Sequence, residues 1–177
     1  FMKQLTIPSY TEKKIKKGQF VLEKQDFPSL PFHDQAVELA NTKGQFIGIG
    51  YLSEQNKGIG WFISHKKVTL DVSFFCQLFQ CAKEKRQVYQ QSEETTAYRL
   101  FNQEWDGFGG FTIDLYQDYA VFSWYNLFVY EMKETVVQAF QHVFPEVAGA
   151  YEKIRFKGLD VESAHLYGQE ASAFFTI

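Results

Sequence analysis

Hydrophobic positions in the first third of the chain alternate with polar ones, as is typical of short β-strands. Three such stretches lie at Ala36–Asn41, Phe46–Ser53 and Ile59–Ser64. The links between them contain Gly44 and Gly58, and glycine readily adopts the positive φ angles that short connections between antiparallel strands require. The pattern predicts a small barrel or curled sheet.

The spacing of apolar residues changes from two to three and four at Asp71. The segment Asp71–Gln91 is predicted to be an amphipathic helix with Asp71 as its N-cap. Two apolar stretches, Phe111–Leu115 and Tyr119–Tyr125, flank Gln117-Asp118 and predict a β-hairpin.

A second amphipathic helix is predicted after Asn126. Apolar residues recur there by three and four from Val129 to Val143, and Pro145 ends the pattern. Ala148–Arg155 is predicted to be a further strand. The segment Gly168–Ile177 is also strand-like and ends within an apolar run, so we expect the chain to be cut just before another domain.

These elements predict an α+β protein of two small domains. Residues 1–68 would form the barrel, and residues 69–177 a mixed α/β domain with the hairpin and both helices.

Apolar residues make up 45% of the chain and charged residues 22%, which is typical of a folded protein and excludes a disordered one. A signal peptide and a twenty-residue apolar run are both missing from the sequence, so we expect a cytoplasmic protein without a membrane segment.

Charge is distributed unevenly around a formal net charge of −3. Residues 1–70 contain 10 Lys and Arg against 6 Asp and Glu, whereas residues 71–177 contain 8 against 15. Four lysines fall within five positions, followed by glycine, in a predicted basic turn: Lys13, Lys14, Lys16, Lys17 and Gly18. Such a cluster can neutralise backbone phosphates of a nucleic acid, although a solvated surface segment has the same composition.

The most unusual stretch runs from Tyr98-Arg99-Leu100 through Glu104-Trp105-Asp106-Gly107-Phe108-Gly109-Gly110 to Asp114. Three carboxylates within eleven residues could indicate an acid/base pair or a metal site. A structural role is favoured instead, because no histidine or second acidic motif lies nearby. We expect Asp106 to accept hydrogen bonds from amides of a glycine turn, and Asp114 to pair with Arg99.

Other catalytic and cofactor motifs are not found in the sequence. The four histidines are scattered without zinc-like spacing, and Gly48-Ile49-Gly50 lies within a predicted strand rather than before a helix. We therefore predict no metal site and no cofactor site in this chain.

The order of these features resembles that of bacterial class I S-adenosylmethionine (SAM)-dependent methyltransferases of 23S rRNA, of the cytosine-C5 type. Three passages support the resemblance: Lys13–Phe27, Ala36–Ser64 with Lys43-Gly44 at its turn, and Tyr98–Asp114. The chain departs from the family at Gln19-Phe20-Val21, where His-Pro-Trp is usual, and at Gly109, where proline is usual.

The resemblance implies a PUA domain, a small central domain and a catalytic domain that lies beyond this chain. SAM and the catalytic cysteine would belong to that missing domain, so this chain alone is expected to be inactive; neither Cys76 nor Cys81 matches the catalytic position. The expected RNA-binding residues are Lys13, Lys14, Lys16, Lys17, Gly18 and Lys43, with 23S rRNA as partner. The expected structural motif comprises Tyr98, Arg99, Glu104, Asp106, Gly107, Gly110 and Asp114.

Two alternatives remain open from the sequence. The chain could be a protein-interaction module, including a homodimer, that uses its exposed aromatic residues and its acidic second half. It could also be an autonomous enzyme that uses Glu104, Asp106 and Asp114.

Overall fold

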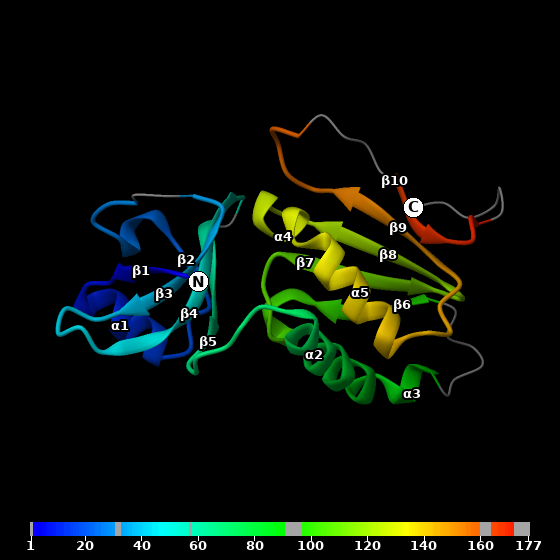
Figure 1. Cartoon of the computed structure of the whole chain (residues 1–177), viewed down its shortest axis with the longest axis horizontal. Helices are drawn as coiled ribbons and strands as arrows, with labels where there is room; N and C mark the ends of the chain where they lie inside the picture. Colours follow the sequence, from blue (N-terminus) through cyan, green and yellow to red (C-terminus); the bar gives the residue numbers. More distant parts are fainter. Residues whose placement is uncertain (1, 31–32, 57, 91–96, 160–163, 172–177) are drawn as a thin grey trace.

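The computed structural model describes residues 2–30, 33–56, 58–90, 97–159 and 164–171. In these residues the chain forms two five-stranded mixed sheets that lie side by side along the long axis of the molecule (Figure 1). The first sheet includes β1 and the second includes the C-terminal strand β10. The described residues form both helices and strands, which agrees with the predicted mixture of α and β structure.

The first sheet has the strand order β1-β3-β4-β5-β2, with β1 parallel to β3 and the other pairs antiparallel. The three predicted strands are confirmed as β3, β4 and β5. Barrel closure stays a prediction, because the described ladders place β1 and β2 at opposite edges. The elements are β1 (Lys3–Thr6), α1 (Ser9–Lys16), β2 (Val21–Leu22), the 3-10 helix η1 (Lys24–Asp26), β3 (Gln35–Ala40), β4 (Phe46–Gln55) and β5 (Gly58–Ser64).

The basic run does not form the predicted turn, because most of it lies in helix α1. Thr11 and Ile15 are buried on the inner side of this helix. With only these two residues buried among four lysines, the segment shows little amphipathic pattern in the sequence. Three lysines occupy its last turn, where cations interact favourably with the helix dipole.

The second sheet has the order β10-β9-β8-β7-β6. The predicted hairpin is confirmed as β7 and β8, with Gln117 at a φ of 56° in its turn. Strands β8 and β9 are parallel because two helices cross over between them. The elements are α2 (Val72–Lys85), α3 (Gln87–Gln90), β6 (Ala97–Asn102), the 3-10 helix η2 (Gln103–Asp106), β7 (Phe111–Tyr116), β8 (Tyr119–Trp124), α4 (Leu127–Glu131), α5 (Lys133–Val143), β9 (Gly149–Ile154) and β10 (Ala164–Gly168).

Both predicted amphipathic helices exist, but each is divided. Asp71 caps the first as predicted, accepting a hydrogen bond from the Phe74 amide, and α2 ends where Arg86 leaves helical geometry. The second is broken at Met132 into α4 and α5. The predicted C-terminal strand is wrong in part: β10 ends at Gly168, residues 169–171 are irregular, and residues 172–177 lie outside the described residues.

Helices α2 and α5 cover one face of the second sheet (Figure 1), and the core between them is built largely from aromatic rings. Phe101 stacks on Phe111 with ring centroids 4.6 Å apart, while Phe79 meets Phe140 edge to face at 5.9 Å. Such pairs contribute roughly 0.5–1.5 kcal/mol beyond area burial. The high aromatic content of the sequence is therefore used mainly for core packing.

The core of the second sheet continues into the first through Tyr51 and Trp61. Tyr51 lies on β4 and stacks on Phe128 of α4, with centroids 4.3 Å apart. The two sheets thus share buried side chains, and the division at residue 68 stays a prediction. No described helix has the length and apolarity needed to cross a lipid bilayer.

Candidate functional site: a basic helix and the seam between two sheets

The structure separates the clustered lysines into two groups. Lys14 donates to the carboxylate of Asp26 at 2.7 Å, and this carboxylate is almost fully buried and also accepts from the Glu23 amide at 2.8 Å. The hydrogen bond to Asp26 raises the pKa of Lys14. Lys16 pairs with Glu12 at 2.9 Å, one helical turn earlier. Two of the four lysines therefore form ion pairs within the domain.

Lys13, Lys17 and Lys43 are exposed, and they form no ion pair within the part of the chain that the structure describes. The turn that carries Lys43 lies against α1, because Asn41 donates to Glu12 at 3.4 Å. Gly18, which follows Lys17 at the end of α1, has a φ of 93° and is exposed. These three lysines are the ones available for an anionic partner.

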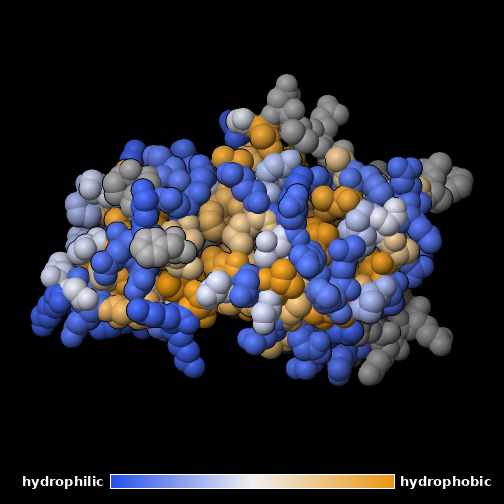
Figure 2. All heavy atoms as spheres, viewed as in Figure 1, coloured by the Kyte–Doolittle hydropathy of each residue, from blue (hydrophilic) through white to orange (hydrophobic). Residues whose placement is uncertain are grey.

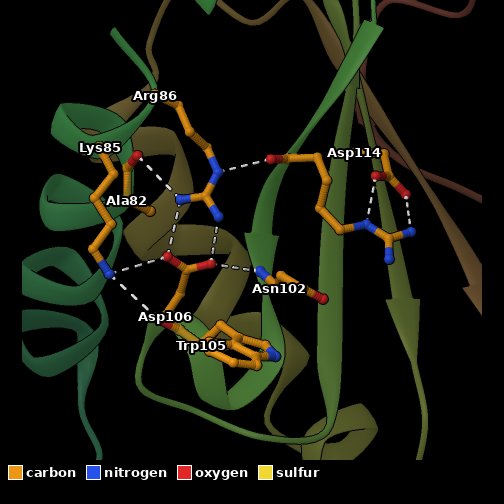
Figure 3. Close-up of polar contacts among 8 residues, drawn as sticks. Ala82, Lys85, Arg86, Asn102, Trp105, Asp106 and Asp114 are labelled. Atoms are coloured by element: carbon orange, nitrogen blue, oxygen red, sulfur yellow. Dashed lines mark hydrogen bonds and ion pairs between the residues drawn. The ribbon is translucent and has the colours of Figure 1, made fainter.

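Asp106 is the centre of a buried ion-pair network (Figure 3). Its two carboxylate oxygens accept from the guanidinium of Arg86 at 2.9 and 2.8 Å, and one also accepts from the Asn102 amide at 2.7 Å. Lys85 lies 3.5 Å away. The predicted bonds to glycine amides are wrong, because the long-range partner Arg86 turns the carboxylate toward α2; the Gly110 amide donates to the side chain of Gln103 instead.

Arg99 and Asp114 form the ion pair expected from the sequence, with distances of 2.9 and 3.1 Å across β6 and β7. This hydrogen bonding raises the pKa of Arg99. The Arg99 carbonyl also accepts from Arg86 at 2.8 Å, so the two ion pairs are connected (Figure 3). Both carboxylates are therefore occupied by cations, which favours the structural role over an acid/base pair.

A second buried network joins the two sheets. The Tyr51 hydroxyl donates to the Gly109 carbonyl at 2.6 Å and accepts from Asn126 at 2.9 Å. Asn126 also donates to Gln55 at 2.7 Å, and its own oxygen caps α4 by accepting from the Val129 amide at 3.0 Å. Burial raises the pKa of Tyr51 well above its ordinary value.

The glycine run of the motif lies at this seam. A Cβ on Gly109 would be 2.0 Å from the ring of Trp61, and one on Gly110 would be 2.2 Å from the Tyr51 hydroxyl. Gly110 also has a φ of 112°, which disfavours any side chain. The sequence analysis found the glycines but not Tyr51 or Trp61, because these contacts span about fifty residues of chain and leave no local pattern.

Glu104 behaves differently from the other two carboxylates. It lines a cavity of about 240 Å³ at the seam, and its Oε2 atom is buried without a hydrogen-bond partner in the described structure. Gln103, which precedes it, has a φ of 49° although it is not glycine. Apolar side chains gather between the two sheets on the face seen in Figure 2, whereas hydrophilic ones cover both ends.

The glycine pair Gly48 and Gly50 does not form a phosphate-binding loop in this structure. Gly48 and Gly50 lie within β4, where a Cβ would meet the Phe62 ring at 2.4 Å and the Trp61 carbonyl at 2.8 Å, so they serve packing of the sheet rather than a phosphate loop. Groups of three or more potential metal ligands are not formed by the described residues.

One comparison with known proteins matches the residues of the first sheet, and others match most of the chain. Residues 5–65 match the family of PUA-like domains. The chain is 35% identical over 160 residues to the Bacillus subtilis protein YwbD, provisionally named a ribosomal RNA large subunit methyltransferase; the match covers 88% of this chain and 40% of that protein. It is 32% identical over 153 residues to ribosomal RNA large subunit methyltransferase I of Photobacterium profundum, covering 83% and 38%.

Two solved structures are more similar still. One, from Streptococcus mutans and provisionally described as a SAM-dependent methyltransferase, superposes with a TM-score of 0.91 at 52% identity, covering 97% of this chain and 44% of that one. A second, provisionally described as a methyltransferase and solved in complex with S-adenosylhomocysteine, has the same TM-score and identity and covers 96% of this chain and 44% of that one. The chain thus spans less than half the length of these relatives.

Proposed function

We propose that this chain is the RNA-binding and RNA-positioning part of a SAM-dependent methyltransferase of the large ribosomal subunit RNA. The observation that carries the proposal is the PUA-like match at residues 5–65, and exposed Lys13, Lys17 and Lys43 lie within these residues. In the family resembled, the PUA domain is expected to bind RNA. Methyl transfer and SAM binding would belong to the portion of the relatives that this chain does not cover.

Finer parts of the proposal follow from the resemblance. They comprise a closed PUA barrel within residues 1–68, a central domain in residues 69–177, 23S rRNA as the RNA, cytosine C5 as the methylated position, and a cytoplasmic location. In this arrangement the seam residues Tyr51 and Asn126 would hold the RNA-binding domain at a fixed angle to the central domain, because both are buried and hydrogen-bonded across the two sheets.

The proposal distinguishes lysines that bind RNA from lysines that hold the fold. Lys13 lies in the last turn of α1 and Lys17 is the C-cap of this helix, four residues later; neither carries an ion pair in the described structure, whereas Lys14 is held by buried Asp26. Phosphate contacts release counterions, so each lost contact lowers the salt dependence of binding by roughly 0.7 for single-stranded RNA.

The test is a fluorescence anisotropy titration of the chain against a labelled single-stranded RNA over a series of salt concentrations. We expect binding that weakens steeply with salt, and a slope of log K against log salt that is lower by about 1.4 in the Lys13→Gln/Lys17→Gln double variant. The matched control is the double variant Lys66→Gln/Lys157→Gln, which removes two exposed lysines outside the basic run. Absence of RNA binding at low salt, or equal slopes in the two double variants, would contradict the proposal.

A protein-interaction function is the second candidate, supported by Trp105, whose side chain is 76% exposed beside the Asp106 network. Sedimentation measurements separate it from the first. A dimer that persists in high salt, is lost in Trp105→Ser and is accompanied by indifference to RNA would favour this candidate.

A further inference from the structure

The cavity at the seam is formed jointly by the two sheets. Trp61 lines it from β5, Gln103 and Glu104 from η2, and Tyr125 and Arg155 from the ends of β8 and β9. Its volume of about 240 Å³ is below the range of roughly 300–1,000 Å³ that is usual for drug-sized ligands. It therefore suits a single small planar group.

One wall of this cavity needs a hydrogen-bond donor. A buried polar atom without a partner costs free energy, and native structures contain few of them. The buried Oε2 of Glu104 has no partner in the described residues, and the neighbouring Gln103 side chain accepts from the Gly110 amide through its Oε1. Because the terminal torsion of a glutamate is soft and roughly two-fold, either carboxylate oxygen can turn toward a ligand.

The other walls offer stacking and positive charge. Tyr125 is half-buried and Arg155 is exposed, and both residues line the cavity. Trp61 is buried, and its indole N–H donates to Gln55 at 2.9 Å, so it forms a fixed wall. A positive φ at Gln103 costs of order 1–3 kcal/mol, and strain of this kind concentrates at ligand sites.

A ligand that matches these groups has adjacent N–H donors on a flat ring and an attached phosphate. Guanine carries N1–H and an N2 amino group on one edge, which together can donate to both oxygens of a carboxylate. Adenine and cytosine each present an amino group beside an acceptor nitrogen, which a carboxylate would repel. The phosphate of the same nucleotide would lie toward Arg155.

We propose that the seam cavity binds an unpaired guanine of the RNA, with Glu104 accepting from its N1–H and N2–H edge, Tyr125 contacting its face and Arg155 its phosphate. This inference rests on the proposed RNA-binding function and adds a base-specific site to the non-specific lysine contacts. Reading a base at the junction would fix the RNA relative to both sheets at once.

The test uses guanosine 5′-monophosphate (GMP) and NMR spectra of the chain, which contains three tryptophans that serve as separate reporters. Trp61 lines the cavity and its indole N–H donates to Gln55, which also lines it; the indole N–H of Trp124 is bonded to Glu152 in the core, and Trp105 is exposed. We expect GMP to shift the Trp61 signal and leave that of Trp124 unchanged. Adenosine and cytidine monophosphates should bind at least about tenfold more weakly.

Two variants assign the contacts. Glu104→Gln replaces one acceptor by a donor and should lower GMP affinity about tenfold or more, while the exposed Glu134→Gln serves as its control. Arg155→Gln should weaken GMP but not guanosine, which lacks the phosphate; this second comparison does not depend on the folding of the first variant.

The inference is overturned if GMP leaves the Trp61 signal unchanged, if the three nucleotides bind equally, or if Glu104→Gln has no effect. It is also overturned if N-acetyl-arginine amide competes GMP out at lower concentration, since the cavity would then take a guanidinium from protein. Nucleotide binding does not involve the lysines of α1, so its failure is distinguishable from a failure of the salt-dependent RNA binding described above.

Discussion

Arg86 and Asp106, twenty residues apart in the chain, form a two-point ion pair in which the carboxylate side chain is 1% exposed and the arginine side chain 16%. This pair links the C-terminal end of α2 to the 3-10 helix that carries the acidic motif. It explains why the helix predicted to reach Gln91 changes direction at Arg86, where the side chain turns inward to Asp106 and to the Arg99 carbonyl.

Replacing Asp106 by Asn is expected to lower the free energy of unfolding by about 3 kcal/mol, because removal of one partner leaves the other charge poorly compensated. Urea denaturation measures the change. The control is Asp114→Asn, which breaks the half-exposed Arg99 pair and should cost less than about 1 kcal/mol. Unchanged stability of Asp106→Asn would return the motif to the enzymatic interpretation.

Gly109→Ala tests whether the glycine run exists to let the two sheets approach. The added Cβ would be 2.0 Å from the Trp61 ring, so we expect a loss of about 1–3 kcal/mol and a shifted Trp61 indole signal. Gly158→Ala provides the contrast, since it has a φ of 99° and open space, and should cost only about 1–2 kcal/mol of backbone strain with no effect on Trp61. An unshifted Trp61 signal in Gly109→Ala would show that the seam is not closely packed.

Asn126→Asp keeps the side-chain oxygen that caps α4 but removes both hydrogen bonds donated to the first sheet. Because Asn126 is fully buried, the change also places a carboxylate beside Tyr51, and we expect unfolding to become easier by about 2–4 kcal/mol. Asn126→Ser, which retains a cap without charge, should lose less. Equal losses in calorimetry would mean that capping, rather than the contact between sheets, is the role of this residue.

Local patterns predicted the parts of this fold whose partners are near in sequence. The hairpin β7–β8 and the N-cap Asp71 were found because alternation and capping act over a few residues. Strand β1 gave no such signal: Lys3 pairs with Val37 only after α1 has intervened. The strand is therefore defined by its long-range partner.

The candidate site shows the same division more sharply. Sequence alone identified Glu104 as part of an unusual motif and predicted partners for Asp106 and Asp114, but it named no partner for Glu104. The structure separates them, because Asp106 and Asp114 have arginine partners while the buried Glu104 oxygen has none in the described residues. Whether a carboxylate has an arginine partner depends on side chains that folding brings together, and the amino-acid sequence alone does not reveal these contacts.

Tyr167 connects stability to pH at the far edge of the second sheet. Burial, followed by the negative charge of Glu146, raises its pKa from an ordinary value near 10 to about 12. A group whose pKa is raised by folding contributes fully below its unfolded pKa and loses that contribution as pH rises through the folded value. We therefore expect the protein to lose stability between about pH 10 and pH 12, since the unfolded chain releases this proton first.

Tyr167→Phe should have two effects in urea denaturation. At pH 7 it should stabilise the protein by about 1 kcal/mol, because the Tyr167 hydroxyl is buried without a partner in the described structure. Between pH 10 and 12 its loss of stability should be shallower than that of the parent chain. The control Tyr119→Phe removes a hydroxyl that donates to the Glu170 carbonyl at 3.3 Å and should not stabilise. Destabilisation by Tyr167→Phe at pH 7 would show that this hydroxyl is hydrogen-bonded in solution.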